Sequence, residues 1–394
     1  MSARTPIESQ PGQPQAMSGQ NSVATSEIRD LAALSLRGLA PMFDTSKQLF
    51  CHRLLSTKNG LVSEGISQRY TIMTLLGLRE LESAGVKTPF DLRGIYNTFA
   101  ADAKWIQGAG DLGLQIWLTA IFDPDNLGSL FQSANCGVAL ERFADAKEGR
   151  TMELAWFLTG LAYAAEANPK FAGDWKDLSA ETFHRINENQ GEYGLFGHLN
   201  AGKSLSGRLR GRIGSFADQV YPIIAFSKYG KVFRVEDALR SALDCARAIC
   251  DAQGKFGQWW WLYDAKTGRV SSRYPVYSVH QHAMAPMCLF AVEEATGQSF
   301  QESIYRGLRW IYGENELGVD MRDDAQNLIW RCVLPVKRQS KFLEMAKSFL
   351  LPTAERNHVG PLEVLYEQRP YEYGWLLYAF GKYVLATPAA KAIS

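Results

Sequence analysis

The chain of 394 residues lacks several features that would assign it directly to a class of protein. It has no run of about 18 uninterrupted apolar residues, so we predict no membrane-spanning helix. Neither charge is in excess, since 42 Lys and Arg stand against 41 Asp and Glu, so we predict no nucleic-acid partner. The six cysteines include no Cys-x-x-Cys pair, and most lie in apolar contexts, which favours reduced, buried thiols.

The N-terminal stretch lacks the apolar segment that a secretory signal requires. Residues 1–25 are instead rich in Ser, Gln, Pro and Gly, a composition typical of disorder. We therefore predict a disordered tail over 1–25, a single domain over 26–394 and a location in the cytoplasm.

Strand-like alternation is scarce, whereas apolar residues recur at spacings of three and four from residue 26 onward. Seven segments share a pattern in which a polar or glycine-rich turn leads into an unusually apolar helix. The polar residues that mark the starts of these segments are Glu64, Asp111, Glu153, Asp218, His280, Asp323 and Glu372. Because the marks recur at intervals of 42 to 65 residues, the chain reads as a degenerate repeat of one helical hairpin.

Amphipathic segments such as "VEDALRSALDCARAICDA" lie between the apolar ones, as outer helices would. This alternation predicts an all-α fold, an (α/α)6–7 toroid in which inner helices line a funnel and outer helices cover them. An open solenoid of helical pairs is the alternative, but solenoid repeats tend to be more uniform in length. Pro286 and Pro370 are tolerated in a first helical turn, so polar residues should gather at one mouth, where the inner helices begin.

This pattern resembles the broad superfamily of α/α toroids, which includes terpenoid cyclases, prenyltransferase β subunits, six-hairpin glycosidases, polysaccharide lyases and sugar epimerases. "QGKFGQW", residues 253–259, fits the Gln-x-x-x-Gly-x-Trp turn of squalene and terpenoid cyclases, and "QGEYGLF" at Gln190 is a partial copy. The resemblance departs from the cyclases at "DMRDD", residues 320–324, whose spacing is wrong for their Asp-x-Asp-Asp acid. No Asp-Asp-x-x-Asp cluster or prenyltransferase-like zinc set is present either.

Carboxylates, amides and aromatic rings dominate the expected mouth, and this mixture suits a polyhydroxylated ligand. The catalytic candidates are His280, His282, Asp218, Asp323, Tyr277 and Glu372. The candidates for substrate binding are Glu64, Arg69, Asp111, Glu153, Gln219, Trp260, Arg212 and Trp375. Carboxylates at helix starts are also common capping residues, so each has a structural interpretation beside the functional one.

The candidates allow several reactions. Glycoside hydrolysis needs two facing carboxylates, which Asp218 with Asp323, or Asp111 with Glu372, would supply. Elimination or epimerisation of a uronate needs a neutral base, a role that suits His280. The His-x-His pair has no third ligand nearby in sequence, so we predict no metal and no cofactor.

A dense basic stretch, residues 202–214, includes Arg212 and has the composition of a solvated loop or of a flap that binds an anion. The leading hypothesis is therefore an enzyme that acts on an anionic, uronate-like saccharide by hydrolysis, elimination or epimerisation. The alternatives are a terpenoid-cyclase-like or prenyltransferase-like enzyme acting on an isoprenoid diphosphate, and a non-catalytic toroid that binds a glycan or a protein. The expected partner is a small molecule or an oligosaccharide.

Overall fold

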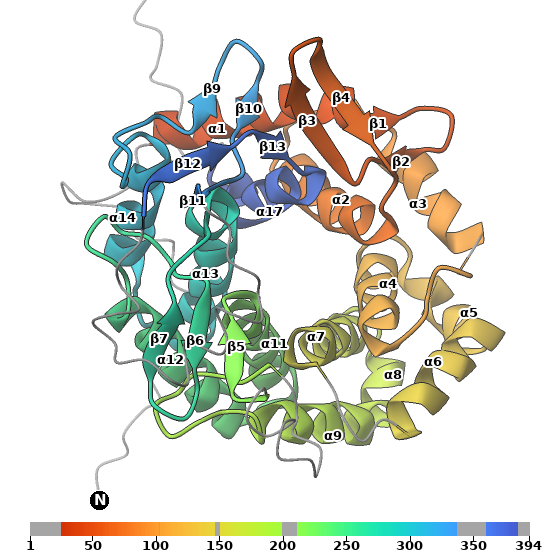
Figure 1. Cartoon of the computed structure of the whole chain (residues 1–394). Coiled ribbons are helices and arrows are strands. Elements are labelled where there is room, and N and C mark those ends of the chain that lie inside the picture. Colours follow the sequence, from red (N-terminus) through yellow and green to blue (C-terminus); the bar gives the residue numbers. More distant parts are fainter. Residues whose placement is uncertain (1–24, 102, 146–149, 199–210, 337–359, 385–394) are drawn as a thin grey trace, which may run out of the picture.

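The computed structural model describes residues 25–101, 103–145, 150–198, 211–336 and 360–384. Within these ranges it forms a closed ring of helices in two layers, the all-α toroid predicted from the sequence (Figure 1). The predicted tail, apart from Thr25, and most of the basic stretch lie outside the described residues.

Six helices form the inner layer of the described residues. They are α2 (Gln68–Ser83), α4 (Ala109–Phe122), α7 (Thr151–Ala167), α11 (Ala217–Phe233), α13 (Ala285–Thr296) and α17 (Pro370–Phe380). Each contacts the next in this order, and α17 packs back against α2, so the ring is closed. A π-helical turn, η3 (His280–Met284), leads into α13.

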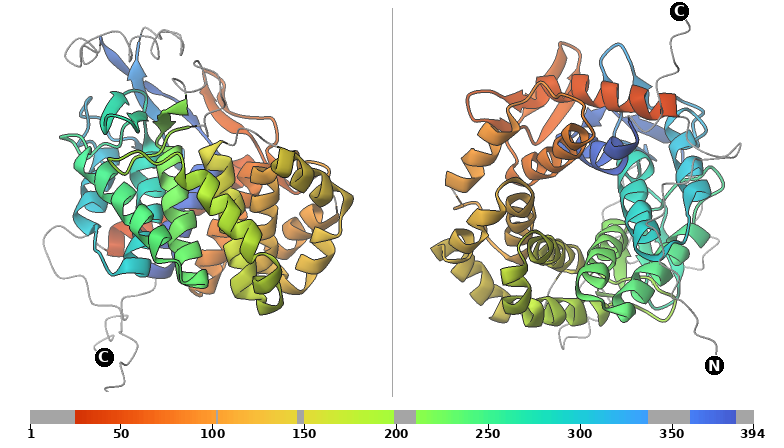
Figure 2. Two further views of the ribbon diagram at one scale, coloured as in Figure 1. Left: turned by 90° about the horizontal axis from the view of Figure 1, so that it is seen from below. Right: turned by 180° about the vertical axis from the view of Figure 1, so that it is seen from behind.

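Six outer helices cover this layer, one for each inner helix (Figure 2). They are α1 (Thr25–Leu39), α3 (Leu92–Ala101), α6 (Ala134–Asp145), α9 (Lys176–Asn187), α12 (Glu236–Asp251) and α14 (Gln301–Ile311). The burial pattern confirms the predicted difference between outer and inner helices. The outer helix α12 buries one face of small and apolar residues, whereas the inner helix α11 is buried almost all round. Two short helices, α5 (Leu127–Phe131) and α8 (Pro169–Asp174), connect neighbouring elements.

Small antiparallel sheets, which the sequence analysis did not predict, gather at one end of the ring (Figure 2). Three of them have three strands each, in the orders β13-β3-β4, β12-β11-β8 and β5-β6-β7. Their strands are β3 (Arg53–Thr57), β4 (Gly60–Glu64), β5 (Ile213–Ser215), β6 (Leu262–Asp264), β7 (Arg269–Ser272), β8 (Val276–Tyr277), β11 (Cys332–Pro335), β12 (Leu362–Leu365) and β13 (Glu367–Gln368). Two further hairpins pair β1 (Phe43–Asp44) with β2 (Leu49–Phe50) and β9 (Arg322–Asp323) with β10 (Leu328–Ile329).

The prediction of an inner helix is wrong for one of the seven segments. The segment around Asp323 forms the β-hairpin β9–β10 and then strand β11. The ring of the described residues therefore consists of six helical hairpins. The mainly apolar stretch 328–335 is only eight residues long and is rich in branched and aromatic side chains, which suits strands better than a helix. The turn between β9 and β10 contains Asn327 with a φ of 57°, a conformation that asparagine tolerates.

The two glutamine-glycine turns have the same structural role in consecutive repeats. Gln253 donates from Nε2 to the carbonyls of Gly257 (2.7 Å) and Ser303 (2.9 Å), which fastens the end of α12 to α14. Gln190 makes the equivalent bonds to Gly194 and Ser241, both at 2.9 Å, which fastens the end of α9 to α12. The cyclase-like turn therefore links outer helices in this chain.

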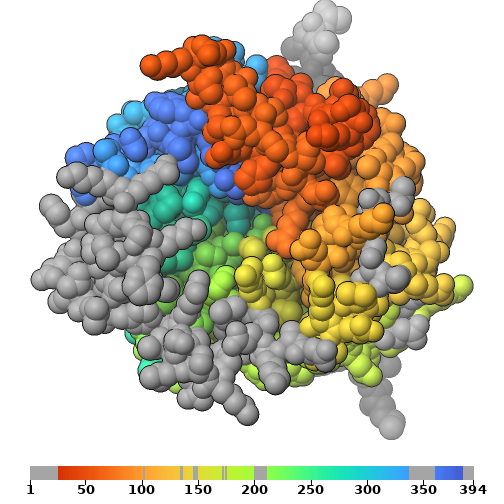
Figure 3. Space-filling model, turned by 45° about the vertical axis from the view of Figure 1, so that its right-hand side comes forward, coloured from red at the N-terminus to blue at the C-terminus, as the bar shows by residue number. Residues whose placement is uncertain are grey.

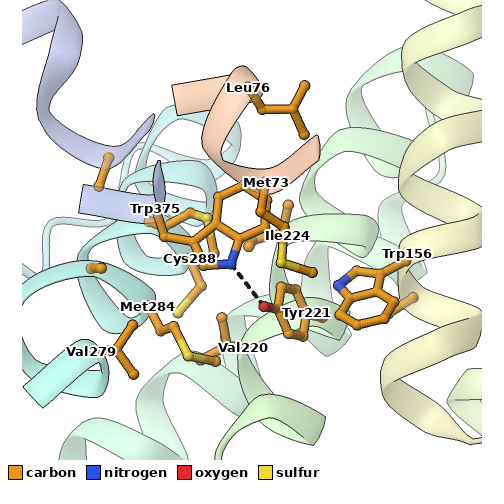
Figure 4. Close-up of a cluster of buried hydrophobic side chains, with 14 of the residues drawn as sticks. Met73, Leu76, Trp156, Val220, Tyr221, Ile224, Val279, Met284, Cys288 and Trp375 are labelled. Carbon is orange, nitrogen blue, oxygen red and sulfur yellow. Dashed lines mark hydrogen bonds between the residues drawn. The ribbon is translucent and has the colours of Figure 1, made fainter. Parts of the chain in front are cut away.

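Below the mouth, the interior of the ring is filled by buried apolar side chains from the six inner helices and from η3, and Figure 4 shows part of this cluster. Trp375 stacks on Trp117 at 5.7 Å and donates from Nε1 to the Tyr221 hydroxyl at 2.9 Å. Met73 from α2 and Met284 from η3 lie in the same cluster. Polar chemistry is therefore concentrated at the mouth, where the inner helices begin.

All six cysteines are free, and five of them are buried, as the sequence predicted. Among the described residues, no helix combines the length and the apolar character needed to cross a bilayer.

Candidate active site at the mouth of the toroid

Each inner helix of the described residues brings a polar side chain to the mouth at an equivalent place, near its start. These side chains are Arg69 in α2, Asp111 in α4, Glu153 in α7, Asp218 in α11, His280 in the turn before α13, and Glu372 in α17. Five of them are marks of the sequence repeat, so the predicted gathering of polar residues at helix starts is confirmed. In the space-filling view of Figure 3, segments from the N-terminal part of the chain (red and orange), the middle (yellow and green) and the C-terminal part (blue) lie around this face.

The first cluster pairs two carboxylates through one arginine. Arg69 donates from Nε to Asp111 Oδ1 at 2.5 Å, and its Nη2 lies 3.5 Å from Glu153 Oε1. The starts of α4 and α7 are close together, because a Cβ atom on Gly110 would lie 2.8 Å from the Glu153 Cβ atom. Asp111 also accepts from the Gln107 N–H at 3.0 Å. This side of the mouth therefore holds two adjacent carboxylates from neighbouring helices.

The exposure of these groups differs in a way that matters for chemistry. The Asp111 side chain is 5% exposed, whereas those of Glu153 and Arg69 are 26% and 39% exposed. Arg150, at the N-cap of α7, is 60% exposed and its Nη1 lies 3.7 Å from Glu153 Oε1. Glu153 is thus the carboxylate of this pair that a substrate reaches most easily.

Asp218 is completely buried and accepts four hydrogen bonds. Its donors are the Ser215 N–H and hydroxyl, both at 2.8 Å, the Met152 N–H at 3.3 Å, and His198 Nδ1 at 3.0 Å. The assignment of the proton to His198 Nδ1 follows from the carboxylate it faces. Asp218 therefore ties β5 to the start of α7 and orients His198, a residue that the sequence analysis missed.

The second cluster is an ion network on the side of α17. The Arg331 guanidinium pairs with Glu372 and lies 3.4 Å from Glu367 Oε1. Arg369 donates to Glu367 at 2.7 Å and to the Tyr70 hydroxyl at 2.8 Å. Burial raises the pKa of Glu372 to about 7, although the adjacent Arg331 favours the ionised carboxylate.

Aromatic side chains surround His280 on the side of α13. Its ring centroid lies 4.5 Å from that of Phe216 and 5.2 Å from that of Tyr277, and it stacks on Trp261 at 6.3 Å with an interplanar angle of 9°. Burial, with a smaller contribution from Arg331, lowers the pKa of His280 to about 3. Burial lowers the pKa of His282 likewise to about 3, and this side chain is 0% exposed. Both imidazoles are therefore neutral at physiological pH.

The prediction that Trp260 faces the funnel is wrong, and its neighbour Trp261 takes that place. Trp260 turns toward the outer layer, where its Nε1 donates to the Ala252 carbonyl at 2.8 Å and Arg273 lies 5.1 Å from its ring centroid. Trp261, in the bend directly before β6, instead lies 5.1 Å from the Tyr277 ring centroid. The sequence has three consecutive tryptophans, residues 259–261, and it does not show which of them faces inward.

Two predicted carboxylates lie apart from the mouth-facing helix starts. Asp323 is in the hairpin β9–β10, where it accepts from the Gln326 N–H at 3.0 Å and from Nε2 at 2.7 Å, so it stabilises its own turn. The suggested pairing of Asp218 with Asp323 does not occur, because each is engaged by other partners. Glu64 is on the edge strand β4, where it is exposed and paired with Arg53 at 2.7 Å.

Three further predicted residues have partners within the protein. Gln219 is buried, accepts from the Phe196 N–H at 2.7 Å and donates to two carbonyls, so both ends of its amide are engaged. Arg212 lies 3.1 Å from Asp264 Oδ2. Trp375 lies in the apolar interior below the mouth. Lys203, Arg208 and Arg210 of the basic stretch lie outside the described residues.

A grouping of three or more His, Cys, Asp or Glu side chains suited to a metal ion does not occur in the part of the chain that the structure describes. Arginines of the mouth pair with carboxylates there, Arg69 with Asp111 and Arg331 with Glu372.

No protein-family model matches the chain, and no curated protein matches it either. Solved structures do match its fold. A possible member of the GH105 family from Klebsiella pneumoniae is 12% identical, with a TM-score of 0.60 over 96% of this chain and 99% of that one. An unsaturated glucuronyl hydrolase from Bacillus sp. GL1, responsible for the degradation of glycosaminoglycan, is 14% identical, with a TM-score of 0.57 over 90% and 96%.

An unsaturated glucuronyl hydrolase specific for heparin is 12% identical, with a TM-score of 0.56 over 91% of this chain and 97% of that one. At such low identity the likeness concerns the fold. The chain therefore has the α/α-toroid fold that these structures share.

Proposed function

We propose that the protein is an enzyme that hydrolyses a glycosidic bond in an anionic, uronate-containing saccharide at the mouth of the toroid. The observation that carries the proposal is the pair of adjacent carboxylates, Asp111 and Glu153, held by Arg69 beside further arginines. The similar structures support it, because two of those named above are glucuronyl hydrolases. A location in the cytoplasm stays a prediction.

The placement of the arginines favours an anionic ligand. Arg150 and Arg369 are the N-cap residues of α7 and α17, and Arg69 is the second residue of α2. Cations are disfavoured at this end of a helix, because the backbone dipole places its positive end there. Three inner helices keep an arginine at this unfavourable position, together with N–H groups that suit an anion. A substrate carboxylate bound next to these arginines would offset the unfavourable interaction of their charges with the helix dipoles.

The two carboxylates have different roles in the proposed hydrolysis. Asp111 accepts from Arg69 and from the Gln107 N–H, two donors that suit an ionised carboxylate. Glu153 is more exposed and would protonate the glycosidic oxygen as its bond to the anomeric carbon breaks, while Asp111 accepts a proton from the water molecule that attacks this carbon. Arg150 would hold the substrate's carboxylate next to this bond. The ring interior, where apolar side chains are buried against one another, plays no part in binding.

We expect Glu153→Gln and Asp111→Asn each to lower kcat at least a hundredfold, since each removes a group needed for proton transfer or charge stabilisation. The assay measures release of the terminal sugar from uronate-ended oligosaccharides. Asp323→Asn is the matched control, because it removes a carboxylate that only stabilises the β9–β10 turn.

A wild-type protein that cleaves no uronate-ended saccharide, or a Glu153→Gln variant that cleaves as fast as wild type, would refute the proposal. Unsaturated products in place of hydrolysed ones would instead assign elimination. Thermal stabilisation by isoprenoid diphosphates but by no saccharide would favour the cyclase-like alternative.

A further inference from the structure

We propose that Trp261 and Tyr277 form a second sugar-binding subsite, which holds a sugar unit beyond the one whose bond is cleaved at Asp111 and Glu153. This inference rests on the proposed function and extends it to the length of the substrate. It starts from two aromatic side chains that are only half-buried at the mouth, in a chain that buries most of its large rings.

The two rings form one surface with His280. Tyr277 lies 5.1 Å from Trp261, and His280 lies parallel to Trp261 at 6.3 Å. Phe216 packs 4.5 Å from the His280 ring and is itself fully buried. The half-buried rings therefore lie on a fixed buried base, as a stacking surface for a sugar requires.

Backbone hydrogen bonds hold the two segments that carry these rings. The Trp261 carbonyl accepts from the Phe216 N–H at 3.0 Å, so the segment carrying Trp261 is fastened to the start of α11. Tyr277 is in β8 and pairs with Cys332 in β11, and the Ser278 N–H donates to the Arg331 carbonyl at 2.8 Å. A preorganised surface of this kind loses little conformational entropy when a ligand binds.

The chemistry around the rings suits a hydroxylated ring better than a hydrocarbon. The Arg331 guanidinium lies 5.0 Å from the Tyr277 ring centroid, and its charge is balanced by Glu372 and Glu367. The Tyr277 hydroxyl supplies a hydrogen-bond donor and acceptor next to an apolar face, while the buried Arg331 guanidinium is held by its two carboxylate partners. Such a pairing of an aromatic face with donors is typical of sugar recognition, since one face of the sugar ring is apolar and its rim carries hydroxyls.

The position of the subsite sets a lower limit on substrate length. α13 and its preceding turn lie across the ring from α4, which carries Asp111 (Figure 1). A single sugar unit bound at Asp111 and Glu153 would leave the Trp261 surface unoccupied. The substrate that uses both is therefore an oligosaccharide of two or more units lying across the mouth.

The test compares the kcat/KM of wild type and variants for an aryl uronide with that for di- and trisaccharides that end in the same uronate. We expect kcat/KM to rise roughly tenfold or more with chain length in wild type, mainly through KM. In Trp261→Ala this gain should disappear, so that the ratio of the kcat/KM values is about 1, and Trp261→Phe should restore part of it. Tyr366→Ala is the matched control, because it removes a half-exposed ring that contacts Trp330, and it should keep the wild-type gain.

A second readout separates this inference from the proposed function. Binding of the trisaccharide to Glu153→Gln, measured by calorimetry, needs no turnover; adding Trp261→Ala should weaken it roughly tenfold. If wild type hydrolyses nothing but Trp261→Ala still weakens trisaccharide binding, the hydrolase proposal fails and the subsite stands. If Trp261→Ala, with an unchanged circular-dichroism spectrum, leaves both the chain-length gain and the binding intact, the subsite is refuted.

Discussion

At the scale of single residues, the first turns of the inner helices carry the polar side chains that gather at the mouth. Asp218 and Glu372 are buried and bonded to neighbouring groups, so they organise the mouth. Glu153 and Arg69 are half-exposed and remain accessible to a ligand. A carboxylate at a helix start can thus cap, pair or react, and the difference lies in its burial and its partners.

The two buried histidines predict a loss of stability in mild acid. Burial lowers the pKa of His280 and His282 to about 3 from the usual 6.5, so the folded protein keeps both neutral while the unfolded chain takes up protons. Their contribution to stability is complete above about pH 6.5 and is lost as the pH falls below it. We expect each to lower the free energy of unfolding by up to about 1.4 kcal/mol per pH unit between pH 6 and 5.

Urea unfolding of wild type and of His282→Gln at pH 7, 6 and 5 measures this effect. The variant cannot titrate at this position, so its free energy of unfolding should fall less steeply as the pH is lowered. The difference in slope should correspond to about one proton taken up on unfolding. Equal slopes in the two proteins would show that His282 is not held neutral in the folded state.

At the scale of elements, close helix contacts close the ring. α2 and α17 approach so tightly that a Cβ atom on Gly77 would lie 1.8 Å from the Gly374 carbonyl oxygen. α4 and α7 meet in the same way, with a Cβ on Gly160 falling 2.3 Å from the Gly113 carbonyl oxygen. The absence of a side chain at these positions lets neighbouring inner helices pack backbone to backbone.

Gly77→Ala is therefore expected to destabilise the protein by about 3 kcal/mol or more, because the new methyl group meets backbone that cannot move aside. Gly137→Ala in α6 is the control, since a Cβ atom there meets nothing within 4 Å. Alanine is the better helix former, so this change should be neutral or stabilising by up to about 1 kcal/mol. Chemical denaturation measures both, and a neutral Gly77→Ala would contradict the tight contact of α2 with α17.

The sequence predicted the helical layers and most of the mouth because apolar periodicity and first-turn polar residues are local signals. It misassigned the segment around Asp323, where an apolar run of strand length resembled the start of a helix. It missed Arg331 and His198, because the contacts that place them at the mouth depend on tertiary packing. Arg369 directly precedes the helix-start proline Pro370, so a signal for that residue existed.

At the scale of the whole molecule, the mouth has two different halves. The side of α4, α7 and α11 carries the carboxylates Asp111, Glu153 and Asp218. The opposite side, formed by α13, α17 and the strands β8 and β13, carries aromatic rings and an arginine network. A saccharide that lies across the mouth would meet acid chemistry on one side and stacking surfaces on the other.

The central claim, that this mouth hydrolyses anionic saccharides, is tested most directly by comparing one uronate-ended oligosaccharide with its methyl ester. The account predicts that wild type cleaves the free acid with a kcat/KM at least tenfold higher, because Arg150 and its neighbours bind the carboxylate. Arg150→Gln should remove most of this preference. Equal cleavage of acid and ester by wild type, or cleavage of neither, would contradict the account.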